Sequence, residues 1–447
     1  MELKFLCESV GLARYCRDVS WRLLLEYPSL SLKLAGYRNL GGTWARLRAD
    51  GTRVYVMGRP QVDMTMWDPV ALRWPWSDPL PSDSTASVEK QPAPLSGGRA
   101  LVRLGGIGVV LLLIALGFFY LGGWFSPNSL TPARFVNAFE RADGVFSGFR
   151  RNHAKGVGVS GYFESNGQGA RLSKAVVFQS GRMPVIGRFS FGGGDPHVAD
   201  APTMVRGLGL QFLLPDGEQW RTAMVNLPVF PFQTPQDFYD NLVASQPDPK
   251  TGKPDPEKMA AFAASHPATV RAIALIQSHA PSSGFDNSAF NSLNAFRFID
   301  AAGTSIPVRW SLAPVEPVVA MSTAGGGQTD KNYMFDALIA SILQHPLQWR
   351  LIITIGKPED PTNDATVAWP DGREQVDVGT LTLDHIESEE TSLARDINFD
   401  PLVLPSGMAP SDDPLLSARS AIYSQSFTRR AGEAKTPSAI SAAEVGK

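Results

Sequence analysis

Residues Arg150–Phe163 read RRNHAKGVGVSGYF, a polar segment with one histidine followed by a run typical of a β-strand. The run from Gly156 onward alternates small and larger residues in the manner of a half-buried strand. A single histidine is more often structural than catalytic. The charged and polar neighbours of His153 nevertheless make it a candidate site residue.

Short strand-like runs separated by Gly and Asp-Gly breaks continue downstream and predict an antiparallel barrel or sheet. They are KAVVFQS (174–180), PVIGRFSF (184–191), GLGLQFLLPDGEQWRTAMV (207–225), FRFID (296–300), VRWSLAP (308–314), WRLIITIG (349–356) and VGTLTLDHI (378–386). Apolar residues at helical spacing predict helices at 129–141, 235–244, 256–264, 267–279 and 413–430. Strands first, helices inserted and a helix last indicate an α+β fold. Residues 431–447 have the composition of a disordered tail.

An uncharged stretch, LGGIGVVLLLIALGFFYLGGWF at residues 104–125, predicts one transmembrane helix. About 20 apolar residues cross a hydrocarbon core of ~30 Å. Tyr120 and Trp124 occupy the far end, where interfacial aromatics are expected. Arg99 and Arg103 at the near end place the N-terminal side in the cytoplasm. An anchor at residues 99–125 is favoured over a cleaved signal, because no small-x-small cleavage site follows.

The segment before the anchor, residues 1–98, has no assigned function. It is rich in Arg and Trp without a sustained apolar period, and Trp76–Gly98 is typical of a flexible linker. Two interpretations stay open. The segment is a small cytoplasmic domain, or it is upstream sequence from too early a start, with Met57, Met64 or Met66 as the later start.

Composition excludes several classes of function. With 43% hydrophobic and 19% charged residues, a net charge of −2 and no basic stripe in the second half, the chain is globular and is not a nucleic-acid binder. Cysteine occurs only at positions 7 and 16, so the main body has no disulfide framework, CxxC zinc site or cysteine nucleophile. Two acidic groups are interpreted as solvated or as a helix start, namely Asp412 with Asp413 and the cluster of Glu387, Glu389 and Glu390.

Five segments, in order along the chain, resemble segments of the catalase superfamily. They are HAKG (153–156), GRFSFGGG (187–194), MVRGLGLQF (204–212), VNLPVFPFQTPQDF (225–238) and ARSAIY (418–423). The proximal string RLFSYPDTHRHRLG of longer catalases is replaced here by RSAIYSQSFTRR (419–430). The chain therefore resembles the shorter catalase-related peroxidases, which are often exported or membrane-anchored in bacteria.

The resemblance implies a catalase-like antiparallel β-barrel with surrounding helices, at residues 126–430, that holds one heme b with ferric iron. Tyr423 would bind the iron through its phenolate. Arg419, four residues earlier on the same helix face, would stabilise that anion. Phe238 would pack on the porphyrin face.

The resemblance also assigns the distal side and the rim of the heme. His153 would move a proton between the peroxide oxygens, and Ser190 would orient the imidazole. Arg150, Arg188 and Arg430 match positions that pair with heme propionates, for which a guanidinium fork is suited.

One position departs from the catalase pattern. The distal asparagine usually lies three residues before the proline of its segment, and Val225 occupies that position here. Asn226 is one residue nearer Pro228, so a local shift would have to bring it into the pocket to serve as the catalytic amide. Without that shift the polarisation of peroxide is weaker, and dismutation is slower.

These residues predict a peroxidase that reduces hydrogen peroxide or organic peroxides with an external organic electron donor, with weak catalase activity. We expect a single-pass protein of the bacterial inner membrane with its catalytic domain in the periplasm. Two alternatives remain open: rearrangement of fatty-acid hydroperoxides at the same heme, and a non-catalytic, membrane-tethered heme-binding barrel.

Overall fold

The computed structural model describes residues 38–40, 43–47, 53–56, 97–121, 129–317, 319 and 330–445. The chain divides into two units, Met1–Arg99 and Ala100–Lys447. In the described part of the first unit, β1 (Arg38–Leu40), β2 (Thr43–Leu47) and β3 (Arg53–Val56) form an antiparallel sheet in that order. The later start methionines and the predicted linker lie outside the described residues, except for Gly97 and Gly98.

Gly97 begins α4 (Gly97–Leu121), the helix predicted to cross a membrane. Its segment Leu101–Tyr120 has a mean hydropathy of 2.4, and none of it is buried against the rest of the structure. The 25 residues of α4 reach about 37 Å, which exceeds the hydrocarbon thickness. The remaining residues of the predicted span, 122–125, lie outside the described residues.

Among the described residues, eight antiparallel strands of the second unit close into a barrel. The ring runs β4, β5, β6, β7, β8, β10, β11, β12 and back to β4, because β10 pairs with β11 and β12 pairs with β4. The strands are β4 (Gly156–Ser165), β5 (Gly181–Phe191), β6 (Arg206–Leu213), β7 (Gln219–Val225), β8 (Phe290–Asn291), β10 (Ser305–Pro314), β11 (Leu347–Ile355) and β12 (Gln375–Glu387). Beside β10, the short β9 (Phe296–Ile299) and β13 (Met408–Pro410) extend the sheet. The predicted α+β class with an antiparallel barrel is confirmed.

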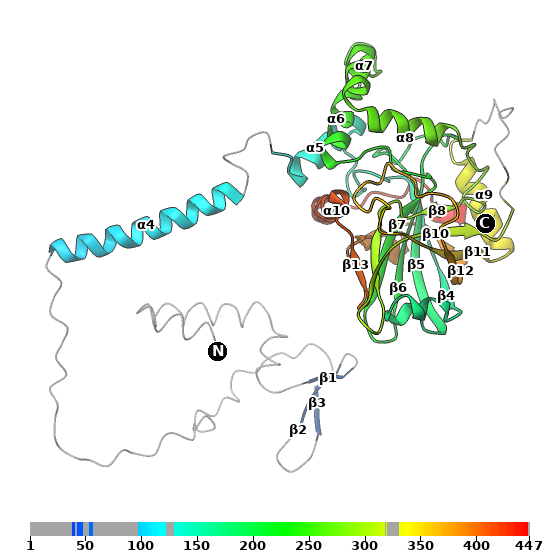
Figure 1. Cartoon of the computed structure of the whole chain (residues 1–447), viewed down its shortest axis with the longest axis horizontal. Helices are drawn as coiled ribbons and strands as arrows, with labels where there is room; N and C mark the ends of the chain where they lie inside the picture. Colours follow the sequence, from blue (N-terminus) through cyan, green and yellow to red (C-terminus); the bar gives the residue numbers. More distant parts are fainter. Residues whose placement is uncertain are drawn as a thin grey trace. The chain divides into compact units, whose positions relative to one another are not determined.

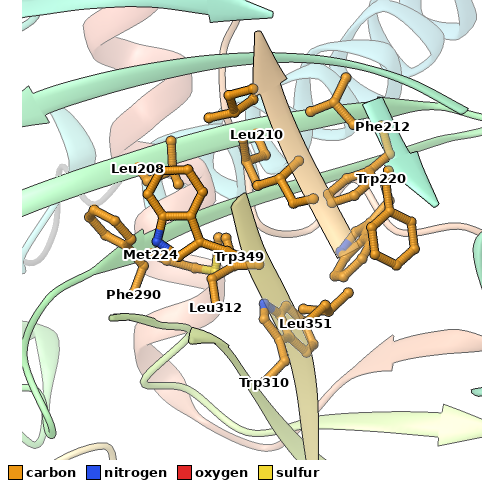
Figure 2. Packing of buried hydrophobic residues seen from close by; sticks show 14 of the residues in the cluster. Leu208, Leu210, Phe212, Trp220, Met224, Phe290, Trp310, Leu312, Trp349 and Leu351 are labelled. Carbon is orange, nitrogen blue, oxygen red and sulfur yellow. The ribbon is translucent and has the colours of Figure 1, made fainter. Parts of the chain in front are cut away.

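Large side chains fill the barrel (Figure 2). Trp220 stacks on Phe212 with ring centroids 4.5 Å apart, and Trp310 meets Trp220 edge-on at 5.2 Å. The indole nitrogens of Trp310 and Trp349 donate to Thr222 Oγ1 and to a backbone carbonyl. Since eight-stranded barrels are just wide enough to be filled by side chains, the interior is a packed core and the site must lie outside it.

Helices cover the barrel. They are α5 (Pro132–Asp143), α6 (Pro235–Ala244), α7 (Pro256–Ser265), α8 (Pro267–Gln277), α9 (Tyr333–Gln344), α10 (Pro414–Ala431) and α11 (Ala442–Val445). All but α9 and α11 begin at a proline. Thr131, Thr234 and Asp413 cap α5, α6 and α10 through their side-chain oxygens. Figure 1 shows α5, α6, α7 and α8 gathered at one end of the barrel, and α10 packs against α5 and α6. Helix α9 was not predicted.

The prediction of a disordered tail after Arg430 is wrong for the described residues up to 445. Ile440 is completely buried and belongs to the main hydrophobic core. Its carbonyl accepts a hydrogen bond of 3.0 Å from Ser388 Oγ, and the carbonyl of Thr436 accepts one of 2.8 Å from Arg395. A single apolar anchor and satisfied backbone carbonyls therefore fix a segment whose small, polar composition suggests disorder.

Candidate active site at one end of the barrel

One large cavity lies between the segment before β4 and helix α10. It encloses about 1370 Å³ of space outside the protein atoms, part of it open to solvent. Apolar and aromatic side chains make up most of its lining, with a few polar and charged groups among them, which is the usual lining of a small-ligand site. All predicted site residues except Asn226 line it, namely Arg150, His153, Arg188, Ser190, Phe238, Arg419, Tyr423 and Arg430.

His153 and Ser190 form a pair on the barrel side of the cavity. His153 Nδ1 and Ser190 Oγ are 3.1 Å apart. Ser190 on β5 pairs with Gly156, the first residue of β4, and this pairing brings it close to the residues just before β4. Burial and, to a smaller extent, the guanidinium groups of Arg188 and Arg419 lower the pKa of His153 to about 3. The imidazole is therefore neutral near pH 7 and able to accept a proton.

The close approach of β6 to His153 and Ser190 explains why a glycine, Gly207, follows Arg206 in this strand. A Cβ placed on Gly207 would lie 3.0 Å from the His153 ring and 3.0 Å from Ser190 Oγ. Contacts between non-bonded carbons are most favourable at about 3.5–4.0 Å, so no larger residue fits without displacing the pair. The backbone of β6 thus forms a wall directly behind the imidazole.

Tyr423 lies on α10 and is held by Arg419 one turn earlier. Arg419 Nη2 donates to the Tyr423 hydroxyl at 3.2 Å and to the carbonyl of Ala223 at 3.0 Å. Its Nη1 donates to Asn294 Oδ1, and Asn294 Nδ2 in turn donates to Asp413 Oδ2 at 2.7 Å. This arrangement fixes the cation beside the phenol oxygen, where it would stabilise a phenolate.

Two members of this network were not predicted as site residues. Asn294 lies in the loop between β8 and β9 and lines the cavity, but no local motif distinguishes it from other loop asparagines. Asp413 was interpreted as a solvated acid or a helix start. It does cap α10, accepting from the Leu415 nitrogen at 2.9 Å, but it is buried rather than solvated.

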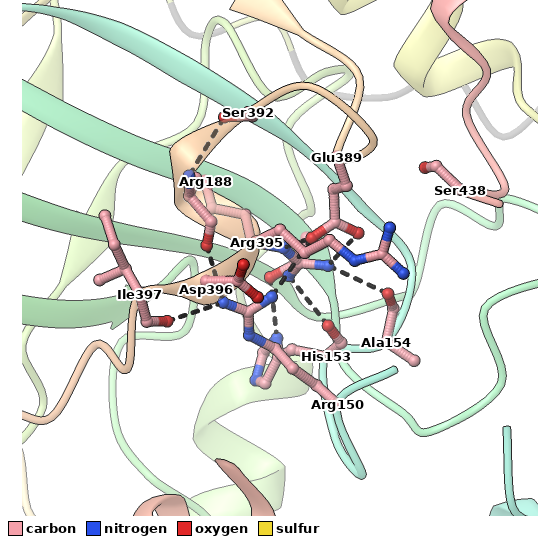
Figure 3. Close-up of polar contacts among 12 residues, drawn as sticks. Arg150, His153, Ala154, Arg188, Glu389, Ser392, Arg395, Asp396, Ile397 and Ser438 are labelled. Atoms are coloured by element: carbon pink, nitrogen blue, oxygen red, sulfur yellow. Dashed lines mark hydrogen bonds and ion pairs between the residues drawn. The ribbon is translucent and has the colours of Figure 1, made fainter. Parts of the chain in front are cut away.

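The three arginines predicted to pair with heme propionates differ in how far their N–H groups are already used, and Figure 3 shows two of them, Arg150 and Arg188. Arg188 donates from Nε and Nη2 to both oxygens of Glu389, at 2.6 and 3.1 Å. Arg150 donates to the same carboxylate at 3.2 Å. Arg430 donates from Nη1 to the carbonyl of Arg395 at 2.6 Å. The prediction that Glu389 is solvated is wrong, because its side chain is only 5% exposed and two guanidinium groups hold it.

Asn226 does not enter the cavity, so the local shift considered from the sequence does not occur. Its side-chain Oδ1 accepts a hydrogen bond of 2.8 Å from the backbone nitrogen of Arg206. The backbone nitrogen of Asn226 donates to the Arg206 carbonyl at 3.0 Å. These bonds continue the β6–β7 ladder by one residue beyond the pair Gly207 and Val225. Val225 lines the cavity instead, which leaves an apolar side chain at the predicted amide position.

Phe238 belongs to an aromatic group on the helical wall of the cavity. Its ring stacks on Phe232 at 4.7 Å and meets Phe135 edge-on at 5.2 Å. Phe135 and Phe139 of α5 line the same wall. The cavity therefore has an apolar, aromatic wall on its helical side, and guanidinium groups belong to the same lining.

Comparison with known proteins agrees with this geometry. The family described as Catalase matches residues 147–441, which include the His153 segment and α10. The chain belongs to the catalase family. It is 36% identical over 324 residues to the "Catalase-related peroxidase" of Synechococcus elongatus, an alignment that covers 72% of this chain and 95% of the relative. It is 31% identical over 307 residues to the protein of the same name from Mycolicibacterium paratuberculosis, covering 68% and 96%.

Solved catalases share the fold of this family member. Catalase A from Saccharomyces cerevisiae superposes with a TM-score of 0.58 at 19% identity, over 64% of this chain and 62% of the yeast protein. A structure described as that of a bacterial catalase gives a TM-score of 0.56 at 19% identity, over 83% of this chain and 66% of that protein. The chain thus spans nearly the whole of the two peroxidases but only about three fifths of the yeast catalase.

Catalase family proteins bind heme, and the donor set of this cavity fits that group. A phenol oxygen and an imidazole face one cavity whose helical wall is aromatic. Arg150, Arg188 and Arg430 line the cavity and outnumber Glu389, the buried carboxylate beside them, so this part of the cavity carries positive charge suited to a dicarboxylate. Tyr423 would hold the iron, and these three arginines would hold the propionates.

Proposed function

We propose that this chain is a heme-dependent peroxidase that reduces hydrogen peroxide or organic peroxides with electrons from an organic donor. The observation that carries the proposal is the placement of the His153–Ser190 pair and the Arg419–Tyr423 pair on the same cavity. The two relatives named catalase-related peroxidase, which the chain covers almost completely, support the same activity. Ferric heme b is the proposed cofactor.

The distal pair supplies proton transfer. Since Nδ1 of His153 is engaged by Ser190, Nε2 is the ring atom that takes a proton from one peroxide oxygen and returns it to the other. The low pKa of His153 keeps the ring unprotonated before peroxide enters, and it favours rapid return of the proton. When bound, the heme supplies the iron that binds peroxide and the electrons that cleave its O–O bond.

The proximal pair sets the character of the iron ligand. Arg419 donates a charge-assisted hydrogen bond to the Tyr423 oxygen, and this cation would stabilise a phenolate bound to iron. The bonds from Arg419 to Asn294 and to the carbonyl of Ala223 keep the guanidinium in place. The phenolate is thereby prepared to bind a ferric ion.

Val225 favours peroxidation over fast dismutation in this proposal. An apolar side chain at the distal position offers no amide hydrogen bond to a bound peroxide. Next to the main cavity lies a second one between α5, α6 and α10, which shares the lining residues Phe135, Pro235, Ala418 and Ile422. These mostly apolar walls give an organic donor or an organic peroxide a route to the site.

The proposed location is the periplasmic face of the bacterial inner membrane, with residues 99–125 as a single anchor. Support comes from the apolar, unburied surface of α4 and from Arg99 and Arg103 at its start. Membrane fractionation followed by protease digestion of spheroplasts tests this location. Recovery of the full-length protein in a soluble fraction would refute it.

An ultraviolet–visible spectrum of the purified full-length chain in detergent, after heme reconstitution, tests the proposed function. We expect a Soret band in the wild type that shifts or collapses in Tyr423→Phe, and peroxide-dependent oxidation of a phenolic donor in the wild type. Tyr162→Phe, on the barrel strand β4 and away from the cavity, is the matched control and should behave as the wild type. No Soret band in the wild type would refute the peroxidase. Dehydration products from a lipid hydroperoxide, in place of an alcohol, would favour rearrangement.

A further inference from the structure

We propose that Glu389 is a positioning residue that fixes the distal histidine segment, residues 150–154, through Arg188 and Arg150. The inference rests on the proposed function for its effect on turnover, but the contacts that carry it are independent of heme. It gives a role to a buried carboxylate that lies outside the cavity lining and outside every motif recognised in the sequence.

Arg188 connects Glu389 to the catalytic histidine. On one side of its guanidinium group, Nε and Nη2 donate to the two carboxylate oxygens of Glu389, at 2.6 and 3.1 Å. On the other side it donates to the His153 carbonyl at 2.9 Å and to the Ala154 carbonyl at 3.0 Å (Figure 3). A bidentate guanidinium–carboxylate pair has one preferred geometry, so the carboxylate determines where these two carbonyls are held.

The held segment is in a conformation that needs support. His153 has a φ of +57°, in the left-handed region that non-glycine residues seldom adopt. Such residues persist where the surroundings enforce them, and they are concentrated at active sites. Arg188 donates to the carbonyls of His153 and Ala154, which belong to the two peptide groups after this strained residue. These bonds therefore act directly on the conformation of His153.

Arg150 attaches the same carboxylate to the other end of the segment. Its Nη1 donates to Glu389 at 3.2 Å, and its Nη2 donates to the carbonyls of Ala394 and Ile397 at 3.0 and 2.9 Å. One carboxylate thus joins the residue that begins the RRNHA segment and, through Arg188, the residues that end it. Loss of this carboxylate would free both ends at once.

The loop that carries Glu389 packs closely against β4, so the backbone position of Glu389 is fixed. A Cβ at Gly156 would lie 2.5 Å from Arg188 Cζ, and one at Gly158 would lie 2.1 Å from Ser392 Oγ. Both glycines therefore make room for this loop and its partner arginine. Ser388, the residue before Glu389, is buried and bonded to the carbonyl of Ile440.

The charges around Glu389 explain why a carboxylate is needed there. Arg150, Arg188, Arg395 and Arg430 surround it, and the other nearby acid, Asp396, is 59% exposed. Burial alone raises the pKa of Glu389, but Arg188 and Arg150 lower it below its ordinary value, so the group is ionised. Without this anion the two buried guanidinium groups repel each other and leave the carbonyls that they hold.

Glu389→Gln tests the role, with Glu390→Gln as the matched control. Glu390 is exposed and its carboxylate accepts from the Ser438 nitrogen, away from the cavity. In the heme-loaded full-length protein we expect Glu389→Gln to retain a Soret band and KM while kcat for peroxide falls by about 10- to 100-fold. In the heme-free protein we expect faster amide hydrogen exchange at residues 150–156, with no such change in Glu390→Gln.

Two further variants keep the test decisive. If Glu389 acts through Arg188, the double variant Glu389→Gln/Arg188→Gln loses no more kcat than Arg188→Gln alone. Glu389→Asp keeps the charge but is one methylene too short to hold both arginines. Its amide hydrogen exchange at residues 150–156 should therefore lie between that of the wild type and that of Glu389→Gln. Glu389→Asp replaces Glu389→Gln if the latter does not fold. Additive losses of kcat, or wild-type exchange in Glu389→Asp, would overturn the assignment. A wild type without peroxide turnover refutes the proposed function alone, because hydrogen exchange still reports on Glu389.

Discussion

Gly207→Ala places one methyl group against the distal pair. The new Cβ would lie 3.0 Å from the ring of His153 and from Ser190 Oγ, which is about 0.5 Å closer than a comfortable contact. The imidazole and the hydroxyl must retreat, and the 3.1 Å contact between them passes the limit of a hydrogen bond. One hydrogen bond is worth about 0.5–1.5 kcal/mol, so we expect kcat for peroxide to fall by about 2- to 13-fold.

Steady-state oxidation of a phenolic donor by the heme-loaded protein measures this effect. The Soret band should be unchanged because Gly207 touches neither Tyr423 nor Arg419. Gly192→Ala is the matched control, since its Cβ would meet Val205 at an ordinary 3.4 Å. Wild-type kcat in Gly207→Ala would show that the orientation of His153 by Ser190 does not limit turnover, and the role assigned to the distal pair would be refuted.

Two further predictions concern stability in the heme-free protein, measured by chemical denaturation. His153 has a pKa of about 3 when folded and 6.5 when unfolded, so its neutral, buried state contributes stability above about pH 6.5 that is lost as pH falls toward 3. From about pH 7 to pH 4 the wild type should lose about 3 kcal/mol more unfolding free energy than His153→Phe, and equal losses would contradict the buried neutral imidazole. Lys155→Met leaves Asp200, 2.6 Å away and fully buried, without its cation, which should cost about 3–5 kcal/mol. A cost under about 1 kcal/mol, as for a surface pair, would show that Asp200 is solvated.

The parts of the site that could be predicted are those carried by short local patterns. His153 and Ser190 lie in two segments that resemble catalase motifs, and the register of β4 against β5 brings them together. Arg419 and Tyr423 are four residues apart on one helix, so their contact follows from helical geometry. The alternation of the strands likewise predicted the barrel, and the prolines and caps predicted most of the helix starts.

The remainder depends on contacts between distant parts of the chain. Nothing near Glu389 indicates that Arg150 and Arg188, more than 200 residues earlier, will bury and neutralise it. Asn226 lies outside the cavity lining because the β6–β7 ladder runs one residue further than the sequence reveals. Ile440 is one apolar residue in a polar tail, which is too weak a pattern to predict that the tail packs against the hydrophobic core. Helix α9 is different, since YMFDALIASILQ does carry apolar residues at helical spacing.

The order of the site residues along the chain determines when a complete cavity can form. His153 precedes every strand of the barrel, whereas Tyr423 follows all of them, and the loop bearing Glu389 is buttressed by residues as late as Ile440. During synthesis from the N-terminus, His153 emerges long before Tyr423, the proposed iron ligand. A partly made chain therefore has no complete cavity, and we expect heme to bind only after translation has passed the final helices.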